Sequence, residues 1–114
     1  MSTKNIKIHI PRGKVSAIGP GKADLLEAIQ HSGSISAAAR QMGMSYKRAW
    51  DLVDTMNKCF REPLVTTAAG GSYGGGAHVT EFGQHILKQY RDIEEKANAS
   101  VAADLQVLTK LLAN

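Results

Sequence analysis

The chain has 114 residues, 43% of them apolar, which suits one small domain with an appended element. Its net charge is +4, the sum of +6 in residues 1–61, which hold ten Lys and Arg against four Asp and Glu, and −2 in residues 62–114. A basic first half favours a nucleic acid or an anionic membrane surface as partner, although ordinary solubilising charge gives the same balance. No window approaches the about 18 apolar residues of a spanning helix, and the first residues lack the apolar stretch of a signal peptide, so we expect a soluble, cytoplasmic protein without membrane association.

The chain opens with an alternating pattern. Three isoleucines alternate with polar residues over residues 4–10, and this period of two predicts a half-buried strand. Residues 11–14, Pro-Arg-Gly-Lys, are typical of a turn, and residues 15–18 are a candidate second strand.

A first helix is predicted over residues 22–31. Leu25, Leu26 and Ile29 form one apolar stripe at helical spacing, and Gly33 is suited to end the helix in a left-handed conformation.

Two further helices follow at once. In the shorter one, either Ser34 or Ser36 caps the first turn, three alanines allow close packing, and Gly43 ends the helix. The longer one runs from Tyr46 to about Phe60 with Ser45 as its N-cap.

The remainder predicts a hairpin and a long helix. Residues 64–67 and 77–80 are strand candidates joined by a glycine-rich loop. Thr80 caps a helix whose apolar residues recur every three or four positions as far as Leu112, a stripe too long for so small a domain to cover. Residues 98–100, Asn-Ala-Ser, favour a break or bend in it.

This order of elements predicts a mainly α fold with a small β wing. It is typical of a winged helix-turn-helix, here in residues 1–80, followed by a C-terminal linker and dimerisation helix in residues 81–114.

The helix that begins at Tyr46 is the expected recognition helix. Ala49, Val53 and Met56 share one face, whereas Lys47 lies on the opposite face. In this motif the first two turns of the second helix contact base edges and the wing approaches the backbone. The residues that we expect at DNA are therefore Ser34, Ser36, Ser45, Tyr46, Lys47, Arg48, Trp50, Asp51, Ser72 and Tyr73.

Two of these residues have alternative interpretations. Asp51 either accepts a hydrogen bond from cytosine N4 or pairs with Lys47 four residues earlier. Trp50 lies between the two faces, and it either contacts DNA or anchors the edge of the core.

The sequence offers no support for catalysis or for a cofactor. The glycine-rich loop lacks the spacing and the Lys-Ser/Thr of a phosphate-binding loop. The four histidines share no metal-ligand spacing, and Cys59, the only cysteine, is expected to be a small core residue. We therefore expect a protein that is not an enzyme and holds no metal.

Three segments carry a resemblance to a known family. These are GSISAAARQMGMSYKRAWDLVDTMN (33–57), PLV (63–65) and GGSYGGGAHVTEFG (70–83). With them, residues 19–91 resemble the N-terminal DNA-binding domain of the ModE molybdate-dependent regulators, a LysR-type winged helix.

The resemblance has implications for assembly and for ligands. It implies a homodimer joined through the first and last helices, and it places the start of the recognition helix at the operator. Members of the family carry molybdate-binding domains after the linker helix, and this chain ends at Asn114 without them. We therefore expect a stand-alone domain, with no small-molecule effector and with a link to molybdate transport genes by resemblance only. The implied dimer residues are Leu25, Tyr90, Ile93, Ala97, Val101, Leu105, Leu108 and Leu112.

The function expected from the sequence is that of a homodimeric, sequence-specific regulator of transcription that binds double-stranded DNA. The alternative is a protein-interaction module that uses the same scaffold to bind an acidic partner. Acidic residues on the recognition helix and a wing without Lys or Arg keep this alternative open.

Overall fold

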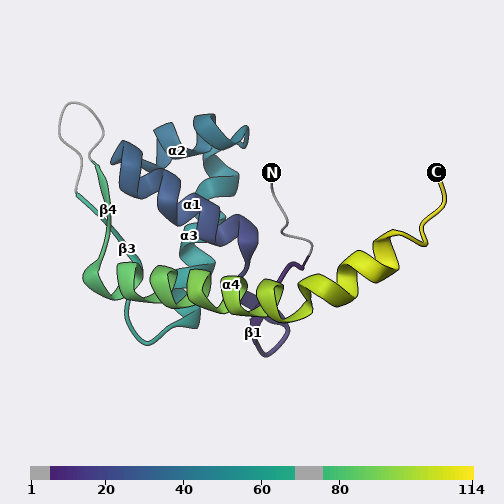
Figure 1. Cartoon of the computed structure of the whole chain (residues 1–114). Helices are drawn as coiled ribbons and strands as arrows, with labels where there is room; N and C mark the ends of the chain where they lie inside the picture. The colour runs from purple at the N-terminus through teal and green to yellow at the C-terminus, as the bar shows by residue number, and fades with distance from the viewer. Residues whose placement is uncertain (1–5, 69–75) are drawn as a thin grey trace.

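The computed structural model describes residues 6–68 and 76–114, and its elements follow the predicted order (Figure 1). Three helices pack together. One hairpin precedes them and a second hairpin follows, and a long helix runs along one side of the domain that these elements form. The elements are β1 (Ile10–Arg12), β2 (Val15–Ile18), α1 (Pro20–Ser32), α2 (Ile35–Met42), α3 (Tyr46–Cys59), β3 (Val65–Thr67), β4 (Ala77–Val79) and α4 (Glu81–Thr109).

The first strand is shorter and begins later than predicted. Residues 6–9 are not in a strand, and β1 begins only at Ile10. The reason lies in its partner: β2 has four residues, and the two strands are joined by a two-residue turn at Gly13 and Lys14. Only the residues next to that turn therefore find antiparallel partners. Gly13 has φ +62°, a conformation that favours glycine.

Capping residues set the boundaries of the helices. Ser34, Ser45 and Thr80 each accept a hydrogen bond from the backbone N–H three residues later, at 2.9, 3.0 and 2.9 Å. Each bond satisfies a donor that the first helical turn leaves free. The two glycines predicted to end α1 and α2, Gly33 and Gly43, do so in the left-handed conformation.

The core lies between α1, α2, α3 and the first half of α4. Its fully buried side chains include Leu26, Ile29, Val53, Met56 and Leu64. Cys59, predicted to belong to the core, is only half-buried at the end of α3.

Two residues implied as dimer contacts are part of this core. Leu25 is 0% exposed and Tyr90 is 2% exposed. Their side chains are enclosed by the chain itself, so the interpretation of these two as contacts to a second chain is wrong.

The last helix is continuous where a break was predicted. α4 passes through residues 98–100, where Asn98 and Ser100 donate side-chain hydrogen bonds to carbonyls of the preceding turn, at 2.9 Å each. These two donors are satisfied within the helix, whereas the buried Oδ1 of Asn98 has no partner among the described residues; the helix nevertheless continues through this segment. The helix ends at Thr109, and Leu112 lies beyond it.

α4 attaches to the domain by its first half only. Its buried residues are Gly83, Leu87, Tyr90 and Glu94, and the second half extends past the other helices (Figure 1). Within residues 6–68 and 76–114, neither α4 nor another helix is long and apolar enough to cross a membrane.

The β3–β4 hairpin is held to α3 by one side chain. The Oδ1 atom of Asn57 accepts hydrogen bonds from the N–H groups of Leu64 (2.8 Å) and Val65 (3.2 Å), and its Nδ2 donates to the carbonyl of Val65 (2.9 Å). No pattern in the sequence indicated this role.

Candidate nucleic-acid interface

The first two turns of α3 present polar and basic side chains to solvent. Tyr46 is 55% exposed, the Lys47 side chain is 85% exposed, and Arg48 is exposed as well. The opposite face of α3 is buried through Ala49 and Val53, as its pattern predicted. The helix is therefore fixed by one face and free on the other.

Ion pairs on the exposed face of α3 are short-range and open to water. Lys47 Nζ lies 3.4 Å from Asp51, and Lys58 Nζ lies 2.9 Å from Asp54. The hydrogen bond and charge of Asp54 raise the pKa of Lys58. Pairs exposed to this degree contribute little to stability, so Lys47 can exchange Asp51 for another anion at small cost. This distance supports the interpretation in which Asp51 pairs with Lys47 four residues earlier.

The indole of Trp50 supports Tyr46. Trp50 is half-buried against the core, and its Nε1 donates a hydrogen bond to the Tyr46 hydroxyl at 2.5 Å. This favours the interpretation of Trp50 as an anchor that orients the more exposed phenol.

The serines near the turn have different surroundings. Ser34 and Ser45 are the N-caps of α2 and α3, so their Oγ atoms already accept backbone hydrogen bonds. Ser36 lies inside α2, is exposed, and accepts a hydrogen bond from Nη1 of Arg40 at 3.1 Å. Ser72 and Tyr73, predicted at the tip of the wing, lie outside the described residues.

The base of the wing is tied to the helix-turn-helix. Ala77 donates its N–H to the carbonyl of Gly33 at 2.8 Å, and Ala68 donates to the carbonyl of Gly76 at 2.9 Å. A Cβ atom on Gly76 would lie 3.1 Å from the same Gly33 carbonyl, so the strand passes very close to the end of α1. The wing therefore begins at a fixed place beside the helices.

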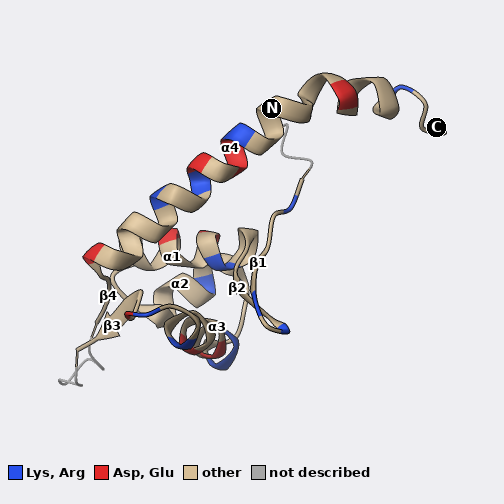
Figure 2. Ribbon diagram, turned by 90° about the horizontal axis from the view of Figure 1, so that it is seen from below, with Lys and Arg blue, Asp and Glu red and all other residues tan. Residues whose placement is uncertain are grey.

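The β1–β2 hairpin lies on the other side of α3 from the wing. Figure 2 shows α3 nearly end-on, with β3–β4 to one side, β1–β2 to the other and α4 crossing the upper part of the picture, away from α3. Lys22 of α1 joins this side by donating from Nζ to the carbonyl of Ser16 at 2.8 Å. Burial lowers the pKa of Lys22; the charge of Cys59 opposes that shift and the charge of Arg48 adds to it. The strand β2 itself packs against α3. The sequence patterns did not indicate the hairpin as a neighbour of α3.

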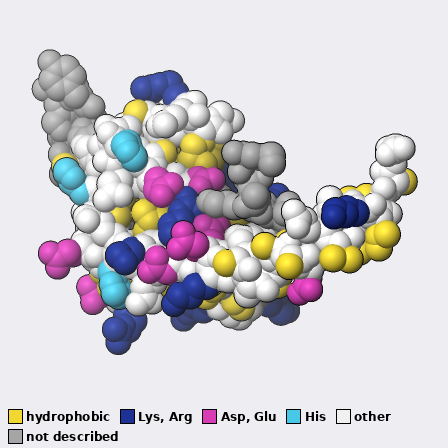
Figure 3. Space-filling view, viewed as in Figure 1, with side chains coloured by type: hydrophobic (Ala, Val, Ile, Leu, Met, Phe, Trp, Pro, Cys, Tyr) yellow, Lys and Arg dark blue, Asp and Glu magenta, His cyan; other side chains and the backbone are white. Residues whose placement is uncertain are grey.

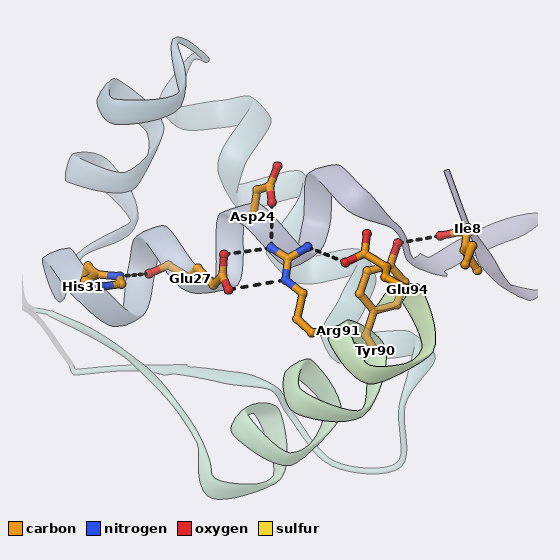
Figure 4. A network of polar contacts seen from close by, with 7 residues as sticks. All are labelled: Ile8, Asp24, Glu27, His31, Tyr90, Arg91 and Glu94. Carbon is orange, nitrogen blue, oxygen red and sulfur yellow. Dashed lines mark hydrogen bonds and ion pairs between the residues drawn. The ribbon is translucent and has the colours of Figure 1, made fainter. Parts of the chain in front are cut away.

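Acidic side chains gather on a different face, over α1 and the first half of α4 (Figure 3). There Arg91 is surrounded by Asp24, Glu27 and Glu94, at 2.7, 2.8 and 2.9 Å (Figure 4). Burial lowers the pKa of Arg91, but the hydrogen bonds that its guanidinium donates to Glu27, Asp24 and Glu94 outweigh this effect, and the pKa rises above its ordinary value. This cluster is formed by residues of α1 and α4 and includes no residue of α3.

The part of the chain that the structure describes contains no group of three His, Cys, Asp or Glu side chains placed to hold a metal ion.

Comparison with known proteins identifies relatives of this chain. It is 39% identical over 108 residues to the molybdenum transport protein ModE of Azotobacter vinelandii, covering 85% of this chain and 40% of that protein. It is 43% identical over 81 residues to the DNA-binding transcriptional dual regulator ModE of Escherichia coli K12, covering 68% of this chain and 31% of that protein. The chain therefore spans two fifths or less of the length of these relatives. No family model matches it.

A solved structure shares the fold. The DNA-binding domain in the crystal structure of a CbnR–DNA complex superposes with a TM-score of 0.59 at 19% identity, over 77% of this chain and 95% of that one. This likeness confirms the predicted class, a mainly α winged helix-turn-helix with a long C-terminal helix.

Proposed function

We propose that this chain, a relative of the ModE regulators, is a DNA-binding transcriptional regulator that inserts the first turns of α3 into the major groove. The observation that carries the proposal is the contrast between the two faces of α3. Lys47 and Arg48 are exposed next to the exposed Tyr46, whereas Ala49 and Val53 anchor the helix in the core. A recognition helix requires this combination of a rigid base and accessible polar side chains.

The individual residues have different proposed roles. Lys47 and Arg48 pair with phosphates or with guanine O6 and N7, and the Tyr46 hydroxyl, oriented by Trp50, contacts a phosphate or a base edge. Asp51 either accepts from cytosine N4 or only holds Lys47 in place. In the same docking, Ser34, Ser36 and Ser45 lie near the DNA backbone. Contacts of Ser72 and Tyr73 with DNA, expected from the sequence, belong to the same proposal.

The named activities of the relatives support the same proposal. One relative is named as a DNA-binding transcriptional regulator, and the structural neighbour was solved bound to DNA. Relatives are also named for molybdenum transport and molybdenum-pterin binding. A link of this chain to molybdate transport genes follows from that association.

We further propose that two copies associate through α4. The second half of this helix lies outside the core and carries large exposed apolar side chains, among them Val107, at 66%, and Leu108, at 61%. Apolar surface on this scale marks an interaction site in a small protein. Residues 81–114 would then be the dimerisation unit, although the first half of α4 is packed on residues 1–80. The contacts proposed from the sequence that remain available are Ile93, Ala97, Val101, Leu105, Leu108 and Leu112.

The DNA proposal is tested by selection of duplexes from a random library, followed by binding measurements on variants. Lys47→Ala and Arg48→Ala should each weaken binding to the selected duplex by about 1–3 kcal/mol, with little loss of stability. Lys58→Ala is the matched control, because Lys58 pairs with Asp54 on the same helix as Lys47 pairs with Asp51. Lys58 lies about three helical turns beyond Lys47, away from the residues proposed to enter the groove. The Lys58→Ala variant should therefore bind DNA as the wild type does.

Two results would contradict these proposals. Failure to select any duplex over random DNA would favour an acidic protein as the partner of this basic face. Sedimentation that shows only monomer at micromolar concentration would contradict the dimer.

A further inference from the structure

We propose that the β1–β2 hairpin is a second, basic wing that contacts the phosphate backbone of DNA, on the side of α3 opposite the β3–β4 wing. This inference rests on the proposed function, because it assigns a further part of the same interface. The contacting side chains are Arg12 and Lys14, on either side of Gly13 at the tip of the hairpin.

The position of the hairpin follows from the sides of α3 that its neighbours occupy. Asn57 of α3 holds β3. The strand β2 packs against α3 as well, and Lys22 of α1 holds β2 through the carbonyl of Ser16. Arg48 and Cys59, whose charges act on the pKa of Lys22, lie roughly 180° and 200° around α3 from Asn57 at 100° per residue. The two hairpins therefore flank α3 on opposite sides, as Figure 2 shows.

The charge of the hairpin suits a polyanion. Residues 6–18 include Lys7, Arg12 and Lys14 and contain no Asp or Glu. Arg12 and Lys14 are exposed, and neither has an ion-pair partner among the described residues. Two unneutralised cations beside a recognition helix raise the affinity for a phosphate backbone without reading sequence.

The opposite wing cannot supply this charge. Residues 64–79, which include β3 and β4, contain no Lys or Arg. Contacts of that wing with the phosphate backbone of DNA would rely on N–H and hydroxyl groups. The positive charge of the interface therefore comes from α3 and from the β1–β2 side.

The hairpin is also anchored well enough to act as a rigid contact. Ala17 and Ile18 at its base are 4% and 2% exposed, and the Lys22 bond to Ser16 ties β2 to α1. Ahead of β1, the Tyr90 hydroxyl donates to the carbonyl of Ile8 at 2.7 Å. The base is thus part of the core, and only the tip projects into solvent.

The test is the salt dependence of binding to the duplex that the wild-type chain selects. If Arg12 and Lys14 each neutralise one phosphate, the double variant Arg12→Ala/Lys14→Ala should reduce the slope of log K against log salt by about 1.8, since each contact contributes about 0.9. Its affinity should fall about tenfold or more at low salt and approach that of the wild type as salt rises. Gly13 is retained because of its positive φ.

A charge-matched control separates contact from long-range attraction. Lys88→Ala/Lys96→Ala removes two exposed cations from α4, on the far side of the domain from α3. At 0.1 M salt the Debye length is about 10 Å, so this variant should keep the wild-type slope. Hydroxyl-radical footprints should show loss of protection at the flank of the site only in the hairpin variant.

The outcomes distinguish this inference from the proposed function. If the wild-type chain selects no duplex, the proposed function fails and the second wing with it. If the wild type binds and Lys47→Ala weakens binding, but the hairpin variant keeps the wild-type slope and footprint, only the second wing is overturned. Thermal unfolding of the hairpin variant at the wild-type temperature excludes misfolding, and Arg12→Gln/Lys14→Gln should reproduce the change in slope.

Discussion

Arg91 of α4 and Glu27 of α1 are joined by two parallel hydrogen bonds, from Nη2 to Oε1 at 2.8 Å and from Nε to Oε2 at 3.3 Å (Figure 4). The two residues are 64 positions apart in the chain. The same guanidinium bonds to Asp24 and to Glu94, whose side chain is only 5% exposed. This cluster fixes the first half of α4 on α1, and with it the direction in which the second half leaves the domain.

Removal of the guanidinium should therefore destabilise the fold. Arg91→Ala leaves the buried Glu94 carboxylate without its partner, and we expect a loss of about 2–3 kcal/mol in urea unfolding, less than for a fully buried pair because Asp24 and Glu27 reach solvent. Adding Glu94→Gln to this variant should restore part of the loss. If the double variant is no more stable than the single one, the buried charge is not the cause.

Tyr90 should make stability sensitive to alkaline pH. Burial, followed by the negative charge of Glu94, raises the pKa of Tyr90 to about 12, from an ordinary value near 10. The folded state thus favours the protonated phenol. The contribution of Tyr90 to the free energy of unfolding is therefore complete below pH 10 and is lost as pH rises toward 12. Tyr90→Phe should be less stable at pH 8 by about 1 kcal/mol, for the lost bond to Ile8. Its free energy of unfolding should then fall less steeply than that of the wild type between pH 10 and 12.

Replacement of Gly83 by alanine compares two opposing effects, the gain in helix propensity and the clash of an added Cβ atom. A Cβ atom at this position would lie 2.3 Å from the carbonyl oxygen of Leu64 and 2.9 Å from a methyl group of Val79. Propensity alone would make Gly83→Ala more stable by about 1 kcal/mol, but the backbone at Leu64, just before β3, would have to move, at a cost of about 1–3 kcal/mol. We expect a net loss in thermal unfolding. Gly21→Ala, where a Cβ meets nothing within 4 Å in the first turn of α1, is the control and should not be destabilised.

The hydrogen bonds that join Asn57 of α3 to Leu64 and Val65 should contribute to the stability of the fold. Asn57→Ala leaves two backbone N–H groups and one carbonyl without partners, so we expect a loss of about 2–3 kcal/mol. Asn57→Asp keeps both acceptor bonds and loses only the donor to Val65, and it should retain more stability than the alanine variant. Amide hydrogen exchange at Leu64 and Val65 should rise in Asn57→Ala and much less in Asn57→Asp.

The local features of this fold were predictable because each depends on residues within a few positions. Ser45 and Thr80 cap their helices through bonds to the N–H three residues later, and the spacing of Ala49, Val53 and Met56 defines the buried face of α3. Periodicity and capping are short-range properties, so the helix-turn-helix and the exposed start of its second helix could be predicted from the residue pattern alone.

Contacts between distant parts of the chain could not be predicted from such patterns. Tyr90 fits the apolar stripe of α4, yet it is enclosed by the core, because α4 packs on the domain over its first half. Likewise, the Arg91 cluster, the Asn57 bonds and the placement of Arg12 and Lys14 beside α3 each join segments far apart in sequence. Such contacts depend on how complete elements pack, and no pattern within a single element encodes that packing.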